Sequence, residues 1–225
     1  MKKDDLSAHV YDVLKERLVT CQYAPNSMLN EVKISTELGC SRTPTREAII
    51  RLEREGFLEV IPKKGIQVTG ITVSDIVQIF QTRKAIEPIG LDLGRNNLDK
   101  HVLEDFRQMF INCKKDIQES YKIDSAFHMY LIEVCRNKFI INMMHSVIDR
   151  NARVTVAQKD KMLLIDSQQE HTDIIDALIE DDIEKAKVAL LEHIEHCRIA
   201  ALDSIYDKNM DTTPALYNTF LKSNN

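Results

Sequence analysis

The stretch Ser41-Arg42-Thr43-Pro44-Thr45-Arg46-Glu47 decides how the first third of the chain folds. The Ser and Thr residues at its start are types that cap a helix, Pro44 suits a first helical turn, and Glu47 stands near the capping-box position. Apolar residues at helical spacing follow it, and Gly56 is a natural stop. The stretch therefore predicts a helix that ends close to residue 56.

The segments on either side of this helix complete a small domain. Apolar spacing predicts an opening helix over 6–18, and Asn30 is suited to cap a short second helix. The β-rich runs 57–61 and 65–69, joined by Pro62-Lys63-Lys64, predict a hairpin. Three short helices followed by a hairpin indicate a winged helix-turn-helix over 1–70.

The rest of the chain shows helical periodicity and no strand pattern. After a linker over 71–74, in which Ser74 is expected to cap the next helix, we expect an all-α helical bundle over 75–208. The chain is thus mainly α in fold class. Pro88 is expected to kink the first helix of the bundle, and the tail 209–225 is expected to be unstructured or loosely docked. The helices are expected over 75–95, 99–118, 120–135, 138–159, 167–180 and 182–207.

Composition excludes several classes of protein. The 225 residues are 44% hydrophobic and 29% charged, with six Gly and five Pro, which is typical of a well-packed helical protein. The charged N-terminus and the lack of a long apolar run predict a cytoplasmic protein without a membrane span. The five cysteines are scattered and never form a C-x-x-C pair, which argues against a disulfide framework and a thiolate zinc site.

The net charge of −5 is unevenly distributed. Residues 1–70 hold 11 Lys and Arg against 10 Asp and Glu, which leaves 19 against 25 for the remainder. A nearly neutral module is able to bind DNA if its basic side chains share one face, because phosphate neutralisation supplies much of the affinity. The charge pattern is therefore compatible with a DNA-binding N-terminus joined to an acidic second domain.

The second helix of a helix-turn-helix pair lies in the major groove, and its first turn reaches bases and phosphates. Arginine there engages guanine in a bidentate way, and small hydroxyls bind phosphate. As an alternative, the arginines merely solubilise the start of a helix. The helix cap, the proline and the basic hairpin tip together favour DNA contact, and the predicted contact residues are Arg42, Thr43, Thr45, Arg46, Lys63, Lys64 and Gly65.

Four residues of the second domain have side chains suited to a divalent metal. Asp124 and His128 are four apart on one expected helix and so share a face. His171 and His193 stand on two further helices. Nitrogen and carboxylate ligands from separate helices suit a first-row divalent metal in a bundle core. Taken singly, each histidine is equally explained as a surface group or a partner of a neighbouring side chain.

The segment from Glu37-Leu38-Gly39-Cys40-Ser41-Arg42 through Gly56-Phe57-Leu58 to Lys64-Gly65 closely resembles the signature of the GntR family of regulators. The helical remainder resembles the FCD branch of that family, and together the two resemblances cover about residues 6–207. The resemblance implies a homodimer on a palindromic double-stranded operator. It also implies that the operator is contacted by Arg42, Thr43, Arg46, Lys64 and Gly65.

Metal-binding members of the FCD branch carry an Asp-x-x-x-His pair followed by two further histidines. Asp124, His128, His171 and His193 match that pattern in kind and order. The resemblance implies a metal that braces the domain and receives a carboxylate-bearing effector. His145 and His196 stand outside the pattern. Zinc, nickel, manganese and iron all remain open, because histidine and carboxylate suit each of them.

Arginine binds carboxylate in a bidentate way, so a cationic side chain above the metal is expected to complete the effector site. Arg83 is the first candidate and Arg150 the second. The alternative for both is an exposed side chain, or a pair with Glu87 or Asp149.

These interpretations combine into a ligand-responsive transcription regulator rather than an enzyme. A small organic acid is expected to shift the protein between DNA-competent and incompetent arrangements. Two alternatives stay open: a purely structural metal, and a metal-dependent hydrolase that activates water at the Asp/His set. The hydrolase needs a general base and a reason to carry a winged helix, and the sequence gives no clear sign of either.

Overall fold

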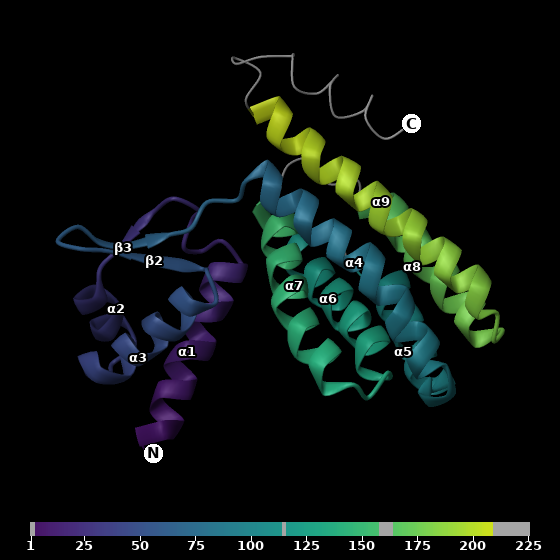
Figure 1. Ribbon diagram of the computed structural model, residues 1–225, viewed down its shortest axis with the longest axis horizontal. Coiled ribbons are helices and arrows are strands. Elements are labelled where there is room, and N and C mark those ends of the chain that lie inside the picture. The colour runs from purple at the N-terminus through teal and green to yellow at the C-terminus, as the bar shows by residue number, and fades with distance from the viewer. Residues whose placement is uncertain (1–2, 114–115, 158–163, 209–225) are drawn as a thin grey trace.

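The computed structural model describes residues 3–113, 116–157 and 164–208 as a winged helix followed by a bundle of helices (Figure 1). The small sheet lies on the N-terminal side, and the remaining described elements are helical. The mainly α fold class is therefore confirmed. The tail expected over 209–225 lies outside the described residues.

The winged helix contains the three helices and the hairpin that the sequence predicts. The Asn30 side chain accepts hydrogen bonds from the backbone N–H groups of Val32 and Lys33, so it caps α2 as expected. The sheet gains a strand that the sequence did not indicate, because two residues are too few to show a period of two. The elements are α1 (Lys3–Val19), β1 (Met28–Leu29), α2 (Glu31–Glu37), α3 (Arg42–Arg54), β2 (Leu58–Ile61) and β3 (Gly65–Val68).

The antiparallel sheet has the order β1-β3-β2, and the hairpin of β2 and β3 projects away from the bundle (Figure 1). The tip turns through Lys63 and Gly65, whose φ angles are 65° and 125°. The second angle suits glycine, which has no Cβ. A Cβ at Gly65 would also lie 3.2 Å from the carbonyl oxygen of Leu29. Glycine therefore sets the shape of the hairpin tip.

The helical bundle buries a large apolar core that includes Phe80, Phe127 and Leu131. Helix α4 includes Pro88, the position at which a kink is expected, and continues beyond it to Gly94. Helix α9 packs against α4 and α8. No helix in the described part of the chain is both long and apolar enough to cross a bilayer. The bundle consists of α4 (Val73–Gly94), a 3-10 turn (Arg95–Asn97), α5 (Lys100–Asn112), α6 (Ile117–Glu133), α7 (Lys138–Ala157), α8 (Leu164–Ile179) and α9 (Ile183–Lys208).

Two expected helix boundaries were wrong. Thr72, not Ser74, caps α4, because its hydroxyl accepts from the N–H of Asp75 while the Asp75 carboxylate accepts from the N–H of Thr72. This reciprocal pair is a capping box. The break expected between 118 and 120 lies earlier, because the carboxylate of Asp116 caps α6 by accepting from the N–H of Gln118.

Helix α7 joins the bundle to the winged helix. Arg150 donates to the carbonyl oxygen of Glu55, just after α3, and Arg153 donates to the carbonyl and hydroxyl oxygens of Thr69, just after β3. Both guanidinium groups also lie within 6 Å of the ring of Phe57. Helix α7 therefore contacts the backbone of the winged helix at two points.

Candidate DNA interface and metal centre

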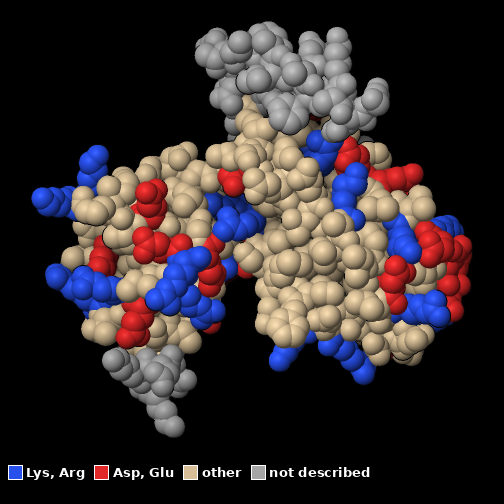
Figure 2. Space-filling view, in the orientation of Figure 1, with Lys and Arg blue, Asp and Glu red and all other residues tan. Residues whose placement is uncertain are grey.

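The first turn of α3 and the hairpin tip present most of the predicted DNA-contact residues to solvent. Arg42, Thr43 and Arg46 are exposed on α3, and Lys63 and Lys64 are exposed on the tip. Figure 2 shows basic side chains projecting from that tip. These positions have the exposure that contact with a phosphate backbone requires.

Thr45 does not belong to this surface. Its side chain is fully buried, and its hydroxyl donates to the carbonyl oxygen of Ser41 at 3.1 Å. Thr45, Ala48 and Leu52 lie on the buried side of α3, which is the spacing of one helix face. The prediction that Thr45 contacts DNA is therefore not supported by its position, and the apolar spacing was the signal that placed it inside.

Glu31 is a residue of this surface that the sequence reasoning missed. Its carboxylate accepts from Nε and Nη2 of Arg46 at 3.1–3.2 Å, so the two groups form a bidentate pair. The pair joins the start of α2 to the first turn of α3. Glu31 therefore sets the orientation of the Arg46 guanidinium while leaving the Arg46 side chain 67% exposed.

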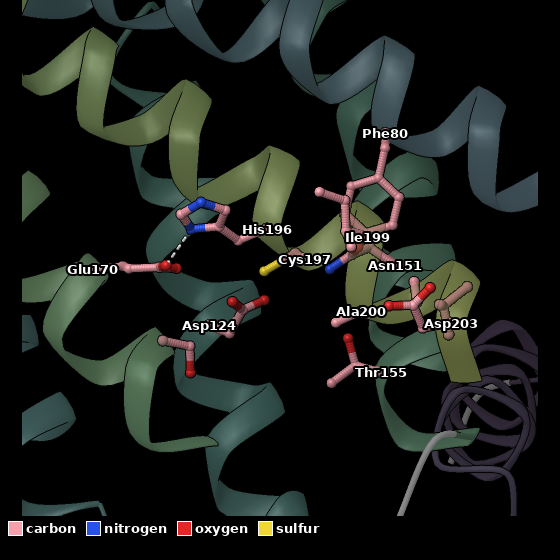
Figure 3. A pocket seen from close by; sticks show the side chains of 13 residues that line it. Phe80, Asp124, Asn151, Thr155, Glu170, His196, Cys197, Ile199, Ala200 and Asp203 are labelled. Carbon is pink, nitrogen blue, oxygen red and sulfur yellow. Dashed lines mark hydrogen bonds and ion pairs between the residues drawn. The ribbon is translucent and has the colours of Figure 1, made fainter. Parts of the chain in front are cut away.

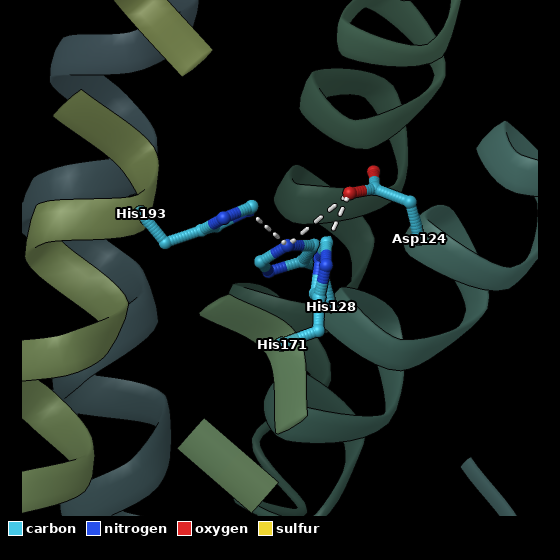
Figure 4. A group of neighbouring side chains, drawn as sticks. All are labelled: Asp124, His128, His171 and His193. Carbon is cyan, nitrogen blue, oxygen red and sulfur yellow. Dashed lines mark hydrogen bonds and ion pairs between the residues drawn. The ribbon is translucent and has the colours of Figure 1, made fainter. Parts of the chain in front are cut away.

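Asp124, His128, His171 and His193 converge inside the bundle (Figure 4). One ligand atom from each of these residues lies within 4.8 Å of the others. The Nε2 atoms of His128 and His193 are 3.3 Å apart, and Nε2 of His171 is 3.1 Å from Oδ1 of Asp124. The three histidines are buried. Helices α6, α8 and α9 thus bring the four predicted ligands to one point.

Each of the three rings has its outer nitrogen fixed by an acceptor. Nδ1 of His128 donates to Glu87 and Nδ1 of His193 donates to Glu170, at 2.7 and 2.8 Å, and Nδ1 of His171 donates to the backbone carbonyl of Ser167. A carbonyl or carboxylate oxygen only accepts, so each Nδ1 carries the hydrogen. The Nε2 atoms of His128 and His193 therefore present lone pairs to the centre, and Nε2 of His171 faces the Asp124 carboxylate, so all three Nε2 atoms lie on the inner side as in metal-ligating histidines.

The distances fit a metal ion. Two nitrogens that share a tetrahedral zinc at about 2.0–2.1 Å lie about 3.3 Å from each other, which matches the distance between the Nε2 atoms of His128 and His193. With hydrogen on both outer nitrogens, those two atoms face each other as lone pairs. A cation between them relieves that repulsion, so this donor set is able to hold a divalent metal.

The protonation states also suit metal binding. Burial and the neighbouring imidazole of His171 lower the pKa of His193 to about 3. Burial likewise lowers the pKa of His128. Burial alone would raise the pKa of Asp124, but His128 and His171 hold it below its usual range. Two neutral imidazoles and a carboxylate are the forms that a metal requires.

Arg83 lies beside this cluster, fully buried on α4. Its Nε donates to Glu87 at 2.6 Å. Burial raises the pKa of Glu87, but Arg83 and His128 outweigh it and hold that pKa at about 2. Nη2 of Arg83 is buried and has no hydrogen-bond partner among the described residues. The first effector candidate thus keeps one unpaired donor beside the cluster, but like Arg150 it is not among the residues that line the neighbouring cavity.

Arg150, the second candidate, lies elsewhere. Its guanidinium contacts the carbonyl oxygen of Glu55 in the winged helix and does not line the cavity beside the cluster. From the sequence, the helical spacing of α7 indicates that the face carrying Arg150 is polar. The spacing does not indicate whether that face contacts a ligand or another domain. The structure therefore assigns Arg150 to the junction of the two domains.

A cavity of 470 Å³ opens beside the cluster (Figure 3). Asp124 belongs to the cluster and also lines the cavity, so the cavity reaches the cluster. Its volume lies in the range of about 300–1,000 Å³ that is typical of small-molecule sites. Apart from Asp124, its lining residues are Phe80, Asn151, Val154, Thr155, Ser167, Glu170, His196, Cys197, Ile199, Ala200, Ala201 and Asp203.

The supporting residues of the cluster were harder to predict than its ligands. Glu87 was considered only as a partner of Arg83, and Glu170 was not considered, although it precedes His171 directly in the sequence. Glu170 accepts from His196 as well as from His193, which places His196 beside the site. Chain spacing gave no signal for these contacts, because they join helices that are far apart in sequence.

Two family models together match most of the chain. The model of the bacterial regulatory proteins of the gntR family matches residues 6–68, and the FCD domain model matches residues 78–196. The chain belongs to the GntR family and carries an FCD domain. It is thus a DNA-binding transcription regulator, since its relatives are regulators and not enzymes.

Individual relatives agree with this assignment. The chain is 27% identical over 191 residues to an HTH-type transcriptional regulator of Streptomyces ambofaciens, covering 82% of this chain and 80% of that one. It is 24% identical over 200 residues to the HTH-type transcriptional repressor RspR of Escherichia coli, covering 84% and 86%. A GntR regulator from Rhodococcus sp. RHA1 shares the fold with a TM-score of 0.78 and 21% identity, covering 88% and 97%.

Proposed function

We propose that this regulator binds a divalent metal and a small carboxylate effector in its FCD domain, and that the effector modulates binding to a palindromic operator. One observation carries the proposal: three inward-facing Nε2 atoms converge with Asp124, and Asp124 also lines a cavity of 470 Å³. A structural metal needs no cavity beside it. The cavity therefore favours ligand sensing over the purely structural alternative.

The metal would be held by His128, His171, His193 and Asp124. When bound, it supplies a Lewis-acidic site that attracts a carboxylate. Arg83 provides a second attraction from the α4 side, because its buried Nη2 still lacks a partner among the described residues. A carboxylate held between a metal and a guanidinium is bound by two charge-assisted interactions.

The operator would be read by the first turn of α3. Arg42 and Arg46 reach base edges or phosphates from exposed positions, and Thr43 binds phosphate at the helix N-terminus. At the hairpin tip, Lys63 and Lys64 contact the DNA backbone or minor groove, and Gly65 gives the tip its shape. We favour repression as the direction of control because the relative RspR is named a repressor.

A homodimer is supported by an apolar face on the bundle. Ile86 on α4 and Ile140 on α7 pack against the same apolar cluster. The exposed residues Ile89 and Leu93 come after Ile86 on α4, and the exposed Met143 comes after Ile140 on α7. Figure 2 shows few charged side chains over α4, α6 and α7. Exposed apolar faces of this kind mark interfaces between proteins. A two-fold dimer would present two winged helices to two half-sites.

The test is a DNA-binding titration with the full-length protein and DNA from upstream of its own gene, at fixed salt. The titration is run on metal-loaded and chelated protein, with and without a series of organic acids, beside metal analysis of the same samples. We expect specific binding that an acid changes only when metal is present. Absence of specific binding in every condition, or an acid effect that is independent of metal, would overturn the proposal.

The hydrolase alternative is separated by one double variant. Replacing Arg42 and Arg46 with alanine removes operator binding from a regulator but leaves the turnover of a metal enzyme intact, because the cluster lies in the other domain. Hydrolysis by the purified protein that survives this double substitution would support the enzyme.

A further inference from the structure

The cavity beside the metal cluster has two polar ends (Figure 3). Asp124 and Glu170 lie at one end, Asn151, Thr155 and Asp203 lie at the other, and Cys197 lies between the two groups. Along α9, Asp203 is ten residues beyond the metal-facing His193, which corresponds to about 15 Å of helix. The wall between the two ends is mostly apolar, with Phe80, Val154, Ile199, Ala200 and Ala201.

Asn151 marks the far end as a binding position. Its side chain is only 3% exposed, lines the cavity and directs its amide into it (Figure 3). The Oδ1 atom is buried and has no hydrogen-bond partner among the described residues. Buried polar atoms in native proteins are nearly always paired. An unpaired amide at the wall of a cavity therefore indicates a ligand group that completes it.

The residues around Asn151 define the chemistry of that group. The carboxylate of Asp203 only accepts hydrogen bonds, the hydroxyl of Thr155 donates or accepts, and the amide of Asn151 does both. Asn151 and Thr155 are four apart on α7, so they share one face of the helix. A ligand group that donates a hydrogen suits the two acceptors there, the Asp203 carboxylate and the unpaired Oδ1 of Asn151, and a second carboxylate would be repelled by Asp203.

We propose that the effector is a bifunctional acid, with a carboxylate at the metal end and a hydrogen-bond donor, a hydroxyl or an ammonium group, at the Asn151 end. This inference rests on the proposed function and names the chemical class of its effector. The apolar wall fits a hydrocarbon body between the two polar groups. Unsubstituted monocarboxylates and dicarboxylates are the classes that the far end disfavours.

The position of Asn151 connects this contact to DNA binding. Its neighbours on α7, Arg150 and Arg153, donate to Glu55 and Thr69 of the winged helix. The donor end of the ligand thus binds the helix that touches the DNA-binding domain, whereas the carboxylate end binds the metal. Ligands with the donor group are therefore expected to change operator affinity more than ligands without it.

The test compares acids matched in length on metal-loaded, full-length protein. For chains of four, six and eight carbons, calorimetry measures binding of the unsubstituted acid, the ω-hydroxy acid, the ω-amino acid and the dicarboxylic acid. At the length that fits, we expect a donor-bearing acid to bind about tenfold more tightly than both the unsubstituted acid and the dicarboxylate, the fold-change of one good hydrogen bond. The hydroxy and amino arms identify which donor is preferred.

Variants locate the preference. Asn151→Leu and, independently, Thr155→Val should each reduce the ratio of the affinity for the donor-bearing acid to the affinity for the unsubstituted acid. Asp203→Asn should relax the rejection of the dicarboxylate, and Asp105→Asn, an exposed charge change on α5, should leave all affinities unchanged. Thermal midpoints with metal establish that each variant is folded, and Thr155→Val, which keeps the side-chain volume, is the second variant if Asn151→Leu is unstable.

The outcomes separate this inference from the function on which it rests. Metal-dependent binding of acids without any preference for a donor group, or with preference for the dicarboxylate, overturns the inference and leaves the proposed function standing. No binding of any acid at any length, with operator affinity unchanged, overturns both.

Discussion

The first turn of α3 and the centre of the helical bundle both depend on polar side chains, but they hold them in opposite ways. Arg46 is held by one half-buried carboxylate, that of Glu31, and remains largely open to solvent. The three histidines of the cluster are buried, and each has its outer nitrogen fixed by an acceptor. The comparison teaches that a surface for a large partner keeps its groups accessible, whereas a site for an ion fixes them before the ion arrives.

The largest effect is expected from removing a ligand of the cluster. His171→Ala should reduce bound metal from about one ion per chain to nearly none, because four ligands become three. A metal present at 1,000 times its Kd stabilises a fold by about 4 kcal/mol, so the free energy of unfolding should fall by a comparable amount. Metal analysis and denaturant titration measure the two effects.

The matched control for this variant is His145→Ala, which removes an exposed histidine of α7. The control should keep both the metal and the stability. If the His171→Ala variant still holds one metal ion per chain, His171 is not a ligand, and the description of the cluster as a site prepared for an ion is wrong.

A smaller effect is expected from substitutions in the first turn of α3, which should lower the affinity for the operator but not the stability of the fold. Arg42→Ala and Arg46→Ala should each weaken operator binding by about 1–3 kcal/mol. The free energy of unfolding should change little, since a surface ion pair such as that of Arg46 with Glu31 contributes about 0–1 kcal/mol to it. Fluorescence anisotropy at fixed salt measures the affinity. Arg54→Ala, at the exposed far end of the same helix, should bind as the unchanged protein does, and equal losses at both ends would contradict the assignment.

The residues that fix the rings should matter less than the ligands themselves. Glu170→Gln weakens the acceptor of Nδ1 of His193 but leaves the ligand in place. Loss of such a supporting contact typically lowers metal affinity about 10–100-fold. Competition with a metal-binding dye measures this, with the exposed Glu184→Gln as control. Unchanged affinity in Glu170→Gln would show that the rings are fixed by packing alone.

The smallest effect is expected at the hairpin tip. Lys64→Ala should weaken binding to all DNA sequences about equally and reduce the slope of log affinity against log salt by about 1, since one phosphate contact is lost. Titrations of specific and unrelated DNA at four salt concentrations measure both quantities. A loss confined to the operator sequence would instead make Lys64 a base-reading residue.

Much of this molecule could be predicted from local patterns. The cap at Asn30, the hairpin 57–69 and the shared helix face of Asp124 and His128 follow from spacing and residue type. The error at Thr45 was avoidable, because its spacing from Ala48 and Leu52 already marks a buried stripe.

The remaining differences depend on contacts across the chain. Arg150 meets Glu55 across 95 positions, and Glu87 meets His128 across 41. No helical period encodes which element packs against a polar face. The family resemblance supplied the ligand pattern, but the acceptors behind the ligands and the polar far end of the cavity required coordinates.

The contacts of α7 with the winged helix have a consequence for how such regulators change over generations. Arg150 binds the backbone oxygen of Glu55, and Arg153 binds the backbone oxygen of Thr69. Every residue type carries that oxygen, so those bonds do not depend on which side chains stand at the two positions. The exposed residues of α3 are thus free to drift toward a new target sequence while the joint to the sensing domain persists, and specificity and control are able to evolve separately.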